Sequence, residues 1–154
     1  MTDLFKKLNF KDQRGVLVIN APANFESELA KMAQVTQIWL DSGEVDHLEF
    51  ALLFVTRQAE VDQLIQQVGP KLHGDALLWF CYPKGTSKRY KCDFNRDNGW
   101  HSLGAFHLEP VRMVAIDDDW SALRFRRQEY IKTLTRNEKM VLSSATKERM
   151  KKKG

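Results

Sequence analysis

The sequence predicts one α/β domain with a mostly parallel six-stranded sheet that ends in an antiparallel hairpin. Short apolar runs rich in β-branched and aromatic residues alternate with segments whose apolar residues have helical spacing. The last two runs are separated only by the acidic turn Asp117–Asp119. So short a connection joins antiparallel strands, whereas alternation of strands and helices is typical of parallel α/β sheets.

The first strand is expected over Gly15–Asn20, a continuous apolar run typical of a strand buried on both faces. Pro22 ends it, because proline cannot continue inside a sheet. Asn24 then fits the N-cap of a helix. The apolar face of that helix comprises Phe25, Leu29, Met32 and Ala33.

The second and third strands are expected at Thr36–Leu40 and Glu49–Thr56. The polar connection 41–48 between them must run extended if it is to cross the first strand, at about 3.3 Å per residue. After the third strand a helix is expected, which ends near Gly69-Pro70. Its apolar positions are Val61, Leu64, Ile65, Val68 and Leu72.

The second half begins with a fourth strand over Leu77–Cys81. A helix over residues 97–108 is expected to bury Trp100, Leu103 and Phe106. The closing hairpin pairs Val111–Ile116 with Trp120–Phe125. We therefore assign residues 1–126 to the α/β domain and 127–154 to a basic helical extension.

Charge is distributed unevenly along the 154 residues, whose net charge is +4. From Arg124 to Gly154 there are 11 Lys/Arg and 3 acidic residues, a net charge of +8, whereas the remaining 13 basic and 17 acidic residues give −4. No apolar run approaches the about 20 residues that span a bilayer. The N-terminus lacks the apolar segment and cleavage site of a signal peptide, so a cytoplasmic location is expected.

Three stretches together resemble a small bacterial domain-of-unknown-function family whose members look like reduced methyltransferase-type Rossmann domains. The stretches are Ala21-Pro22-x-x-Phe25, Leu78-Trp79-x-x-Tyr82-Pro83-Lys84 and Asp117-x-x-Trp120-Ser121-Ala122-Leu123-Arg124-Phe125. The resemblance covers about residues 10–126 and brings no established activity. It implies a three-layer Rossmann-like fold with the strands in the order second, first, third, fourth, sixth, fifth.

In that topology ligands bind where the strand order reverses, between the first and third strands. The loops expected to meet there are Ala21–Phe25, Thr56–Gln58 and Tyr82–Lys88. They carry five hydrogen-bond donors, three of them cationic: Asn24, Arg57, Lys84, Ser87 and Lys88. This set suits a phosphate or carboxylate. The alternative is a solvated rim of charged side chains without a ligand.

No cofactor is expected. S-adenosylmethionine and dinucleotides need a glycine-rich turn after the first strand, where the backbone approaches the cofactor. Here that turn is Ala21-Pro22-Ala23-Asn24, which has no glycine. Asp41 stands where a ribose-binding acid is expected, but a loop aspartate is more often merely solvated. A degenerate methyltransferase remains an alternative.

We identify no catalytic residue and no metal site. Cys81 is expected to be buried, and Cys92 has no visible activating partner. The histidines His47, His73, His101 and His107 lack zinc-ligand spacing. Asp117–Asp119 are better explained by hydrogen bonding within a tight turn than by binding of magnesium. Trp120 is expected to pack the hairpin against the domain. Ser121 has no visible base partner.

The leading hypothesis is thus a non-catalytic module that binds a small anion or nucleotide through the cationic loops. The alternative is an interaction module that binds nucleic acid or a protein through the basic tail, because clustered Lys/Arg attract phosphates. Tyr82 and Tyr90 beside Lys84–Lys91 would extend such a surface. A membrane role is disfavoured, since Ser143, Ser144 and Thr146 interrupt any apolar face of the tail.

Overall fold

A computed structural model describes residues 1–95 and 98–131. Its centre is one six-stranded sheet in the order β2-β1-β3-β4-β6-β5. The strands are β1 (Gly15–Ile19), β2 (Gln37–Trp39), β3 (Leu48–Phe54), β4 (Leu72–Pro83), β5 (Leu108–Ala115) and β6 (Trp120–Arg127). The first four pair in parallel, and β6 pairs antiparallel with both β4 and β5. The predicted Rossmann-like α/β class, strand order and closing hairpin are confirmed.

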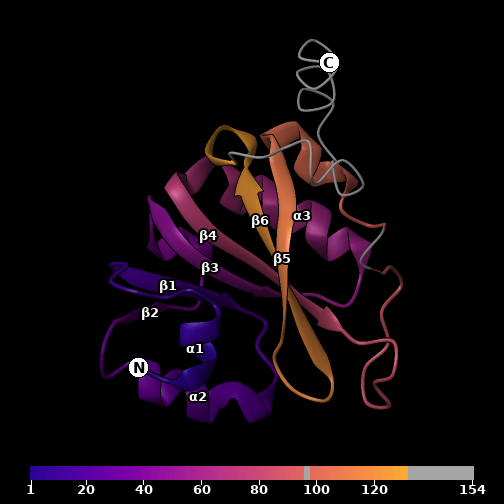
Figure 1. Cartoon of the computed structure of the whole chain (residues 1–154), viewed down its shortest axis with the longest axis horizontal. Helices are drawn as coiled ribbons and strands as arrows, with labels where there is room; N and C mark the ends of the chain where they lie inside the picture. The colour runs from indigo at the N-terminus through magenta and orange to yellow at the C-terminus, as the bar shows by residue number, and fades with distance from the viewer. Residues whose placement is uncertain (96–97, 132–154) are drawn as a thin grey trace.

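Helices cover both faces of this sheet (Figure 1). They are α1 (Asp3–Lys7), α2 (Glu26–Met32) and α3 (Gln58–Val68), with 3-10 turns η1 (Ala23–Phe25), η2 (Ser42–Glu44), η3 (Gly69–Lys71), η4 (His101–Phe106) and η5 (Gln128–Tyr130). α1 and α2 pack on one face, and α3 and η4 on the other. None of the helices in the described part of the chain is long and apolar enough to cross a membrane.

The two cores follow from the alternation of side chains along the central strands. In β3, Phe50, Leu52 and Phe54 point to α1 and α2, whereas Ala51 and Leu53 point to α3. All five are at most 1% exposed. A strand buried on both faces reads as a continuous apolar run, which is why β3 was predicted correctly.

Three local predictions are wrong: the Asn24 cap, the helix over residues 97–108 and the extended connection 41–48. Asn24 lies inside η1 and caps nothing, because α2 begins only at Glu26 after Phe25. The helix expected over residues 97–108 is the 3-10 turn η4, since Gly99 has φ +89° and cannot be helical. Of this predicted helix, Asp97 lies outside the described residues.

The connection 41–48 is not uniformly extended. Asp41 closes a turn by accepting a hydrogen bond from Gly43 N at 2.8 Å, and η2 follows. Lys71 Nζ donates to Val45 O at 2.9 Å and holds the connection against the sheet. In the C-terminal part, β6 runs to Arg127 and η5 follows; the predicted basic helix from residue 132 on lies outside the described residues.

Helix α1 was not predicted, and its packing supports a direct test. Phe5 is fully buried, and its ring stacks on that of Phe50 with centroids 5.9 Å apart. Phe5→Ala should lower the free energy of unfolding by about 3–5 kcal/mol, the usual cost of removing a buried phenylalanine. Urea denaturation measures this cost. The exposed neighbour substitution Lys6→Ala is the control and should change stability by less than about 0.5 kcal/mol. If Phe5→Ala and Lys6→Ala had equal free energies of unfolding, α1 would not pack against the sheet.

Candidate functional site

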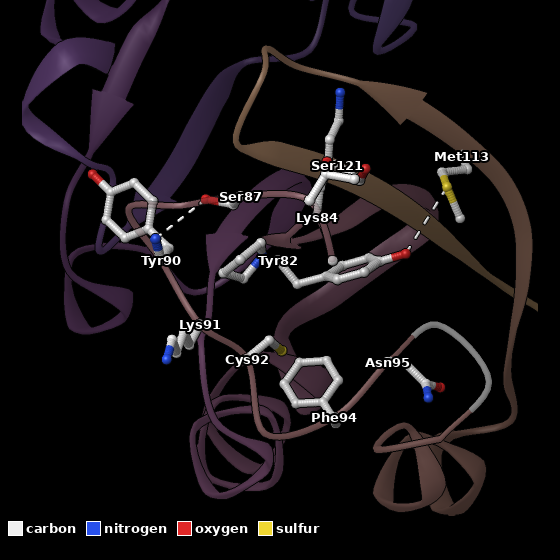
Figure 2. Close-up of a pocket in the computed structure, with 13 residues that line it drawn as sticks. Tyr82, Lys84, Ser87, Tyr90, Lys91, Cys92, Phe94, Asn95, Met113 and Ser121 are labelled. Atoms are coloured by element: carbon white, nitrogen blue, oxygen red, sulfur yellow. Dashed lines mark hydrogen bonds between the residues drawn. The ribbon is translucent and has the colours of Figure 1, made fainter.

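A cleft of about 670 Å³ opens where β4 ends (Figure 2). One wall is the end of β4 and the loop that follows it, from Lys84 to Asn95. The other wall comes from the closing hairpin, through Met113 on β5 and Ser121 on β6. The cleft therefore lies at the carboxyl edge of the parallel strands, beside β4, β6 and β5 rather than between β1 and β3.

The inner surface of the cleft is aromatic. The Tyr82 ring centroid lies 6.0 Å from that of Phe94, and both rings pack on the buried Trp100, at 5.5 Å and 4.9 Å. The Phe94 ring is held where a Cβ atom on Gly99 would approach it to 2.7 Å. Gly99 also has a positive φ, so glycine is required there for two reasons. Tyr82 and Phe94 thus line the cleft as the exposed part of a packed aromatic cluster, with 6% and 8% of each residue exposed and Trp100 buried behind them.

The loop after β4 is fastened to the hairpin. Lys84 N donates to Asp119 O at 2.8 Å, and the Ser87 hydroxyl donates to Asp119 Oδ1 at 2.9 Å. The same hydroxyl accepts a hydrogen bond from Tyr90 N at 3.2 Å. The Tyr90 ring packs on Trp120 with centroids 4.8 Å apart. Ser87 is thus engaged in positioning the loop.

The same loop is fastened a second time, at the N-terminus of α3. Asp93 Oδ1 accepts a hydrogen bond from Gln58 N at 2.8 Å, and Asp93 N donates to Thr56 O at 3.2 Å. Glu60 Oε1 accepts from the backbone nitrogens of Thr56 and Arg57 at 2.8 and 3.0 Å. The positive end of a helix favours anions, and here two carboxylates of the chain itself satisfy it.

The five predicted donors fall into three places. Lys84 and Ser87 line the aromatic cleft. Asn24 and Lys88 line a neighbouring cavity of about 520 Å³, together with Asp117, Asp118 and Asp119. Thr86 lines both cavities. Arg57 precedes α3, is exposed and lines neither cavity.

The polar groups of the cleft lie around its mouth. The Lys84 side chain extends away from the rings of Tyr82 and Phe94, and the Lys91 ammonium points outward on the other side (Figure 2). Ser121 is 8% exposed and faces the cleft opposite Tyr82, its register partner. Sequence reasoning missed Phe94, Met113 and Ser121. Only the register of β4 with β6 could have placed Ser121 beside Tyr82.

Neither cysteine has the environment of a nucleophile. Burial raises the pKa of the Cys81 thiol well above its ordinary value, and the Asp117 carboxylate raises it further. Burial also raises the pKa of Cys92; a backbone hydrogen bond at Phe94 opposes this, and the carboxylates of Asp93 and Glu60 add to it. Both thiols stay protonated at neutral pH.

The acidic turn behaves as a turn. Asp117 Oδ1 accepts hydrogen bonds from the backbone nitrogens of Asp119 and Trp120, at 2.8 and 2.9 Å. Trp120 is 3% exposed and packs edge-on against Phe54. The predicted roles of Asp117 in the turn and of Trp120 in packing the hairpin are confirmed. Among residues 1–95 and 98–131, no three His, Cys, Asp or Glu side chains are placed to hold a metal ion.

No protein-family model and no curated protein matches the sequence. Solved structures of similar fold include a fibrillarin/Nop5p complex, which is 11% identical with a TM-score of 0.45 over 77% of this chain and 74% of that one. A Methanococcus jannaschii fibrillarin, a pre-rRNA processing protein, is 11% identical with a TM-score of 0.46 over 76% and 68%. A Streptococcus agalactiae protein of the NADB-Rossmann superfamily is 12% identical with a TM-score of 0.46 over 99% and 82%. These similarities concern the fold alone.

The cysteine environments predict slow thiol chemistry. In the native protein a disulfide reagent should modify Cys92 more slowly than a free thiol and leave Cys81 unmodified until the chain unfolds. Because the thiolate reacts, the Cys92 rate should rise about tenfold per pH unit below its raised pKa. Stopped-flow absorbance with Cys81→Ala and Cys92→Ala variants assigns the two rates. Rapid modification of Cys92 at neutral pH would contradict this environment.

The Asp93 contact predicts a coupled loss of stability and loop order. Asp93→Ala removes the acceptor for Gln58 N and should lower the unfolding free energy by about 1 kcal/mol, as for a lost helix cap. Hydrogen exchange of the 84–95 amides should accelerate in the same variant. Asp118→Ala, an exposed aspartate of the hairpin turn, is the matched control. If both variants exchange alike, Asp93 does not hold the loop.

Proposed function

We propose that this protein is a non-catalytic module that binds a small anion bearing a flat apolar group, such as a nucleotide, in the cleft at the end of β4. The observation that supports this most is the combination of the Tyr82–Phe94 aromatic surface with Lys84 and Lys91 at the mouth. The rings accept the flat group, and the ammonium groups meet the anionic group near solvent. The neighbouring cavity, which shares Thr86, is lined by Asp117, Asp118 and Asp119 as well as by Lys88, so the anionic group is expected on the side of Lys84 and Lys91.

The magnitudes fit a ligand of moderate affinity. Stacking of one base on an aromatic side chain contributes about 1–3 kcal/mol. A hydrogen bond to a charged group adds about 1.5–3 kcal/mol where it is shielded from water. Lys84 is half-buried and Lys91 is exposed, so Lys84 should contribute more. Arg57 has no part in this proposal.

The side chains of the cleft favour binding over chemistry. Among the described residues that line it there is no imidazole and no carboxylate to act as a general base. The Ser87 hydroxyl is engaged with Asp119 and Tyr90, and the Cys92 thiol is protonated. Other hydroxyls line the cleft, among them those of Thr86 and Ser121, and they suit hydrogen bonds to a ligand.

A nucleotide–nucleoside comparison tests the proposal. Differential scanning fluorimetry with nucleoside monophosphates, aromatic carboxylates and S-adenosylmethionine identifies a ligand, and calorimetry gives its affinity. Lys84→Ala should weaken binding of the phosphorylated form about tenfold, since a charged hydrogen bond is lost. It should leave the matching nucleoside almost unaffected. Met113→Ala should weaken both forms alike, because Met113 contacts only the flat group.

Lys11→Ala, an exposed lysine after α1, is the matched control for charge. The proposal fails if no anion in the panel raises the melting temperature of the wild type. It also fails if Lys84→Ala and Lys11→Ala bind the phosphorylated ligand equally well. Tight binding of S-adenosylmethionine, independent of Lys84, would favour a degenerate methyltransferase instead.

A further inference from the structure

The hairpin that forms one wall of the cleft carries three arginines on its other face. Arg112 on β5 is the register partner of Arg124 on β6, and Arg126 lies two residues further along β6. Side chains alternate along a strand, so all three stand on the face that packs α1, opposite to Met113 and Ser121. We call Arg112, Arg124 and Arg126 the guanidinium cluster.

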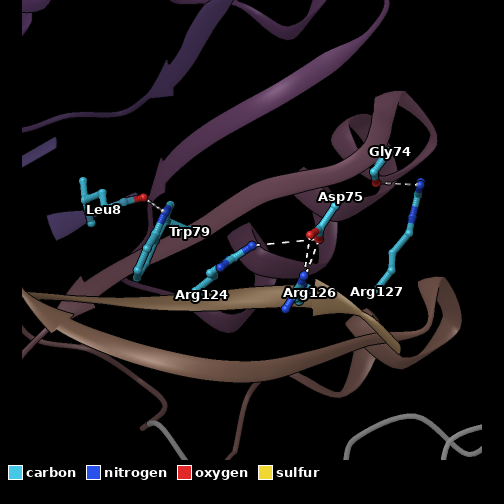
Figure 3. Close-up of polar contacts among 7 residues, drawn as sticks. All are labelled: Leu8, Gly74, Asp75, Trp79, Arg124, Arg126 and Arg127. Carbon is cyan, nitrogen blue, oxygen red and sulfur yellow. Dashed lines mark hydrogen bonds and ion pairs between the residues drawn. The ribbon is translucent and has the colours of Figure 1, made fainter. Parts of the chain in front are cut away.

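The platform under the guanidinium cluster is rigid. Trp79 on β4 is the register partner of Arg124 and is fully buried. Its ring nitrogen donates to Leu8 O at 3.1 Å, which fixes the end of α1 beside the cluster (Figure 3). The next residue, Asn9, accepts a hydrogen bond from Arg112 Nη1 at 3.0 Å. The three guanidinium groups are therefore held by well-packed elements.

Within residues 1–95 and 98–131, Arg126 is the member of the cluster with a close carboxylate partner. Its Nε donates to Asp75 Oδ1 at 2.9 Å, and a second nitrogen donates to Asp75 Oδ2 (Figure 3). Glu109, opposite Arg126 on β5, is 3% exposed and closed to solvent. Arg124 reaches Asp75 only at 3.9 Å, and its buried Nε has no hydrogen-bond partner in the part of the chain that the structure describes. The excess positive charge thus lies on Arg112 and Arg124.

This arrangement is unfavourable for the isolated fold. Like charges directly opposite each other on neighbouring strands are destabilising. Burial lowers the pKa of Arg124, the neighbouring Arg126 and Arg112 lower it further, and Asp75 only partly opposes them. Arg124 has a side chain 13% exposed, so its charge is poorly screened by water. A bound anion would remove the repulsion.

The sequence around the cluster indicates an extended polyanion. The sequence after β6, residues 128–154, holds 8 Lys/Arg and 3 acidic residues besides the cluster. Planar guanidinium forks match phosphate groups in two-point hydrogen bonds. A nucleic-acid strand carries phosphates at regular short intervals, which can meet several guanidinium groups at once. A peptide with one carboxylate side chain has no such series of regularly spaced anionic groups.

From this geometry we infer that Arg112 and Arg124, with Arg126, bind the phosphate backbone of a single-stranded nucleic acid. The contact should be independent of base sequence, because the guanidinium groups pair with phosphates and not with base edges. It lies on the other face of the hairpin from the cleft, so a small ligand and a nucleic acid do not compete directly.

Fluorescence anisotropy with labelled oligo-dT and oligo-U, on the full chain across a salt series, tests the inference. Arg112→Gln and Arg124→Met should each weaken binding about tenfold at low salt. The slope of log affinity against log salt is negative, and each lost phosphate contact should make it shallower by about 0.7. Arg57→Gln, an exposed arginine at the carboxyl end of β3, loses the same charge and should change the affinity less than about twofold.

The melting temperatures of the arginine variants and the affinity of an Asp75 variant distinguish lost phosphate contacts from misfolding. Arg112→Gln and Arg124→Met should melt no lower than the wild type, since they relieve repulsion. Asp75→Asn should bind oligo-dT several-fold more tightly, because it releases the Arg126 guanidinium; this arm holds even if Arg124→Met folds poorly. The inference is overturned if the arginine variants bind with the affinity and salt slope of Arg57→Gln. It is also overturned if poly-glutamate of matched charge binds as tightly as oligo-dT.

Discussion

The hydrogen bond between Asp93 and the first turn of α3 determines where this protein presents a site. An open helix N-terminus beside the strand-order reversal is the usual place for an anion in such folds. Here Asp93 accepts from Gln58 N, and Glu60 satisfies the amides of Thr56 and Arg57. The loop after β4 is drawn across the sheet edge by this contact, and the cleft forms between the loop and the hairpin.

The hairpin then gives the molecule two surfaces of different chemistry. Because side chains alternate, Met113 and Ser121 face the aromatic cleft, while Arg112 and Arg124 face the side of α1. We propose that one surface binds a small flat anion and that the other binds a chain of phosphates. Both rest on the register that Asp117 sets by closing the turn with Asp119 and Trp120.

The strands of the sheet were predictable because each is marked by a local pattern of apolar and turn residues in the sequence. The cleft was not predictable from such patterns. Continuous apolar runs and the Asp117 turn predicted the strands and the hairpin, whereas the strand order was implied by the resemblance to methyltransferase-type Rossmann domains. Helix α1 has five residues, too few to show a period. The cleft depends on contacts between residues far apart in the sequence, Asp93 with Gln58 and Ser87 with Asp119, which no local pattern encodes. These contacts explain why the five predicted donors are divided among three places.

The most direct test of this account is an amide NMR titration with adenosine 5′-monophosphate, a probe with a flat base and an anionic phosphate. Binding in the cleft predicts shift changes confined to the end of β4 and the loop at 82–95, with Met113 and Ser121 on the hairpin. Changes centred on residues 20–25 and 56–58, at the reversal between β1 and β3, would contradict it. So would a spectrum that adenosine 5′-monophosphate leaves unchanged.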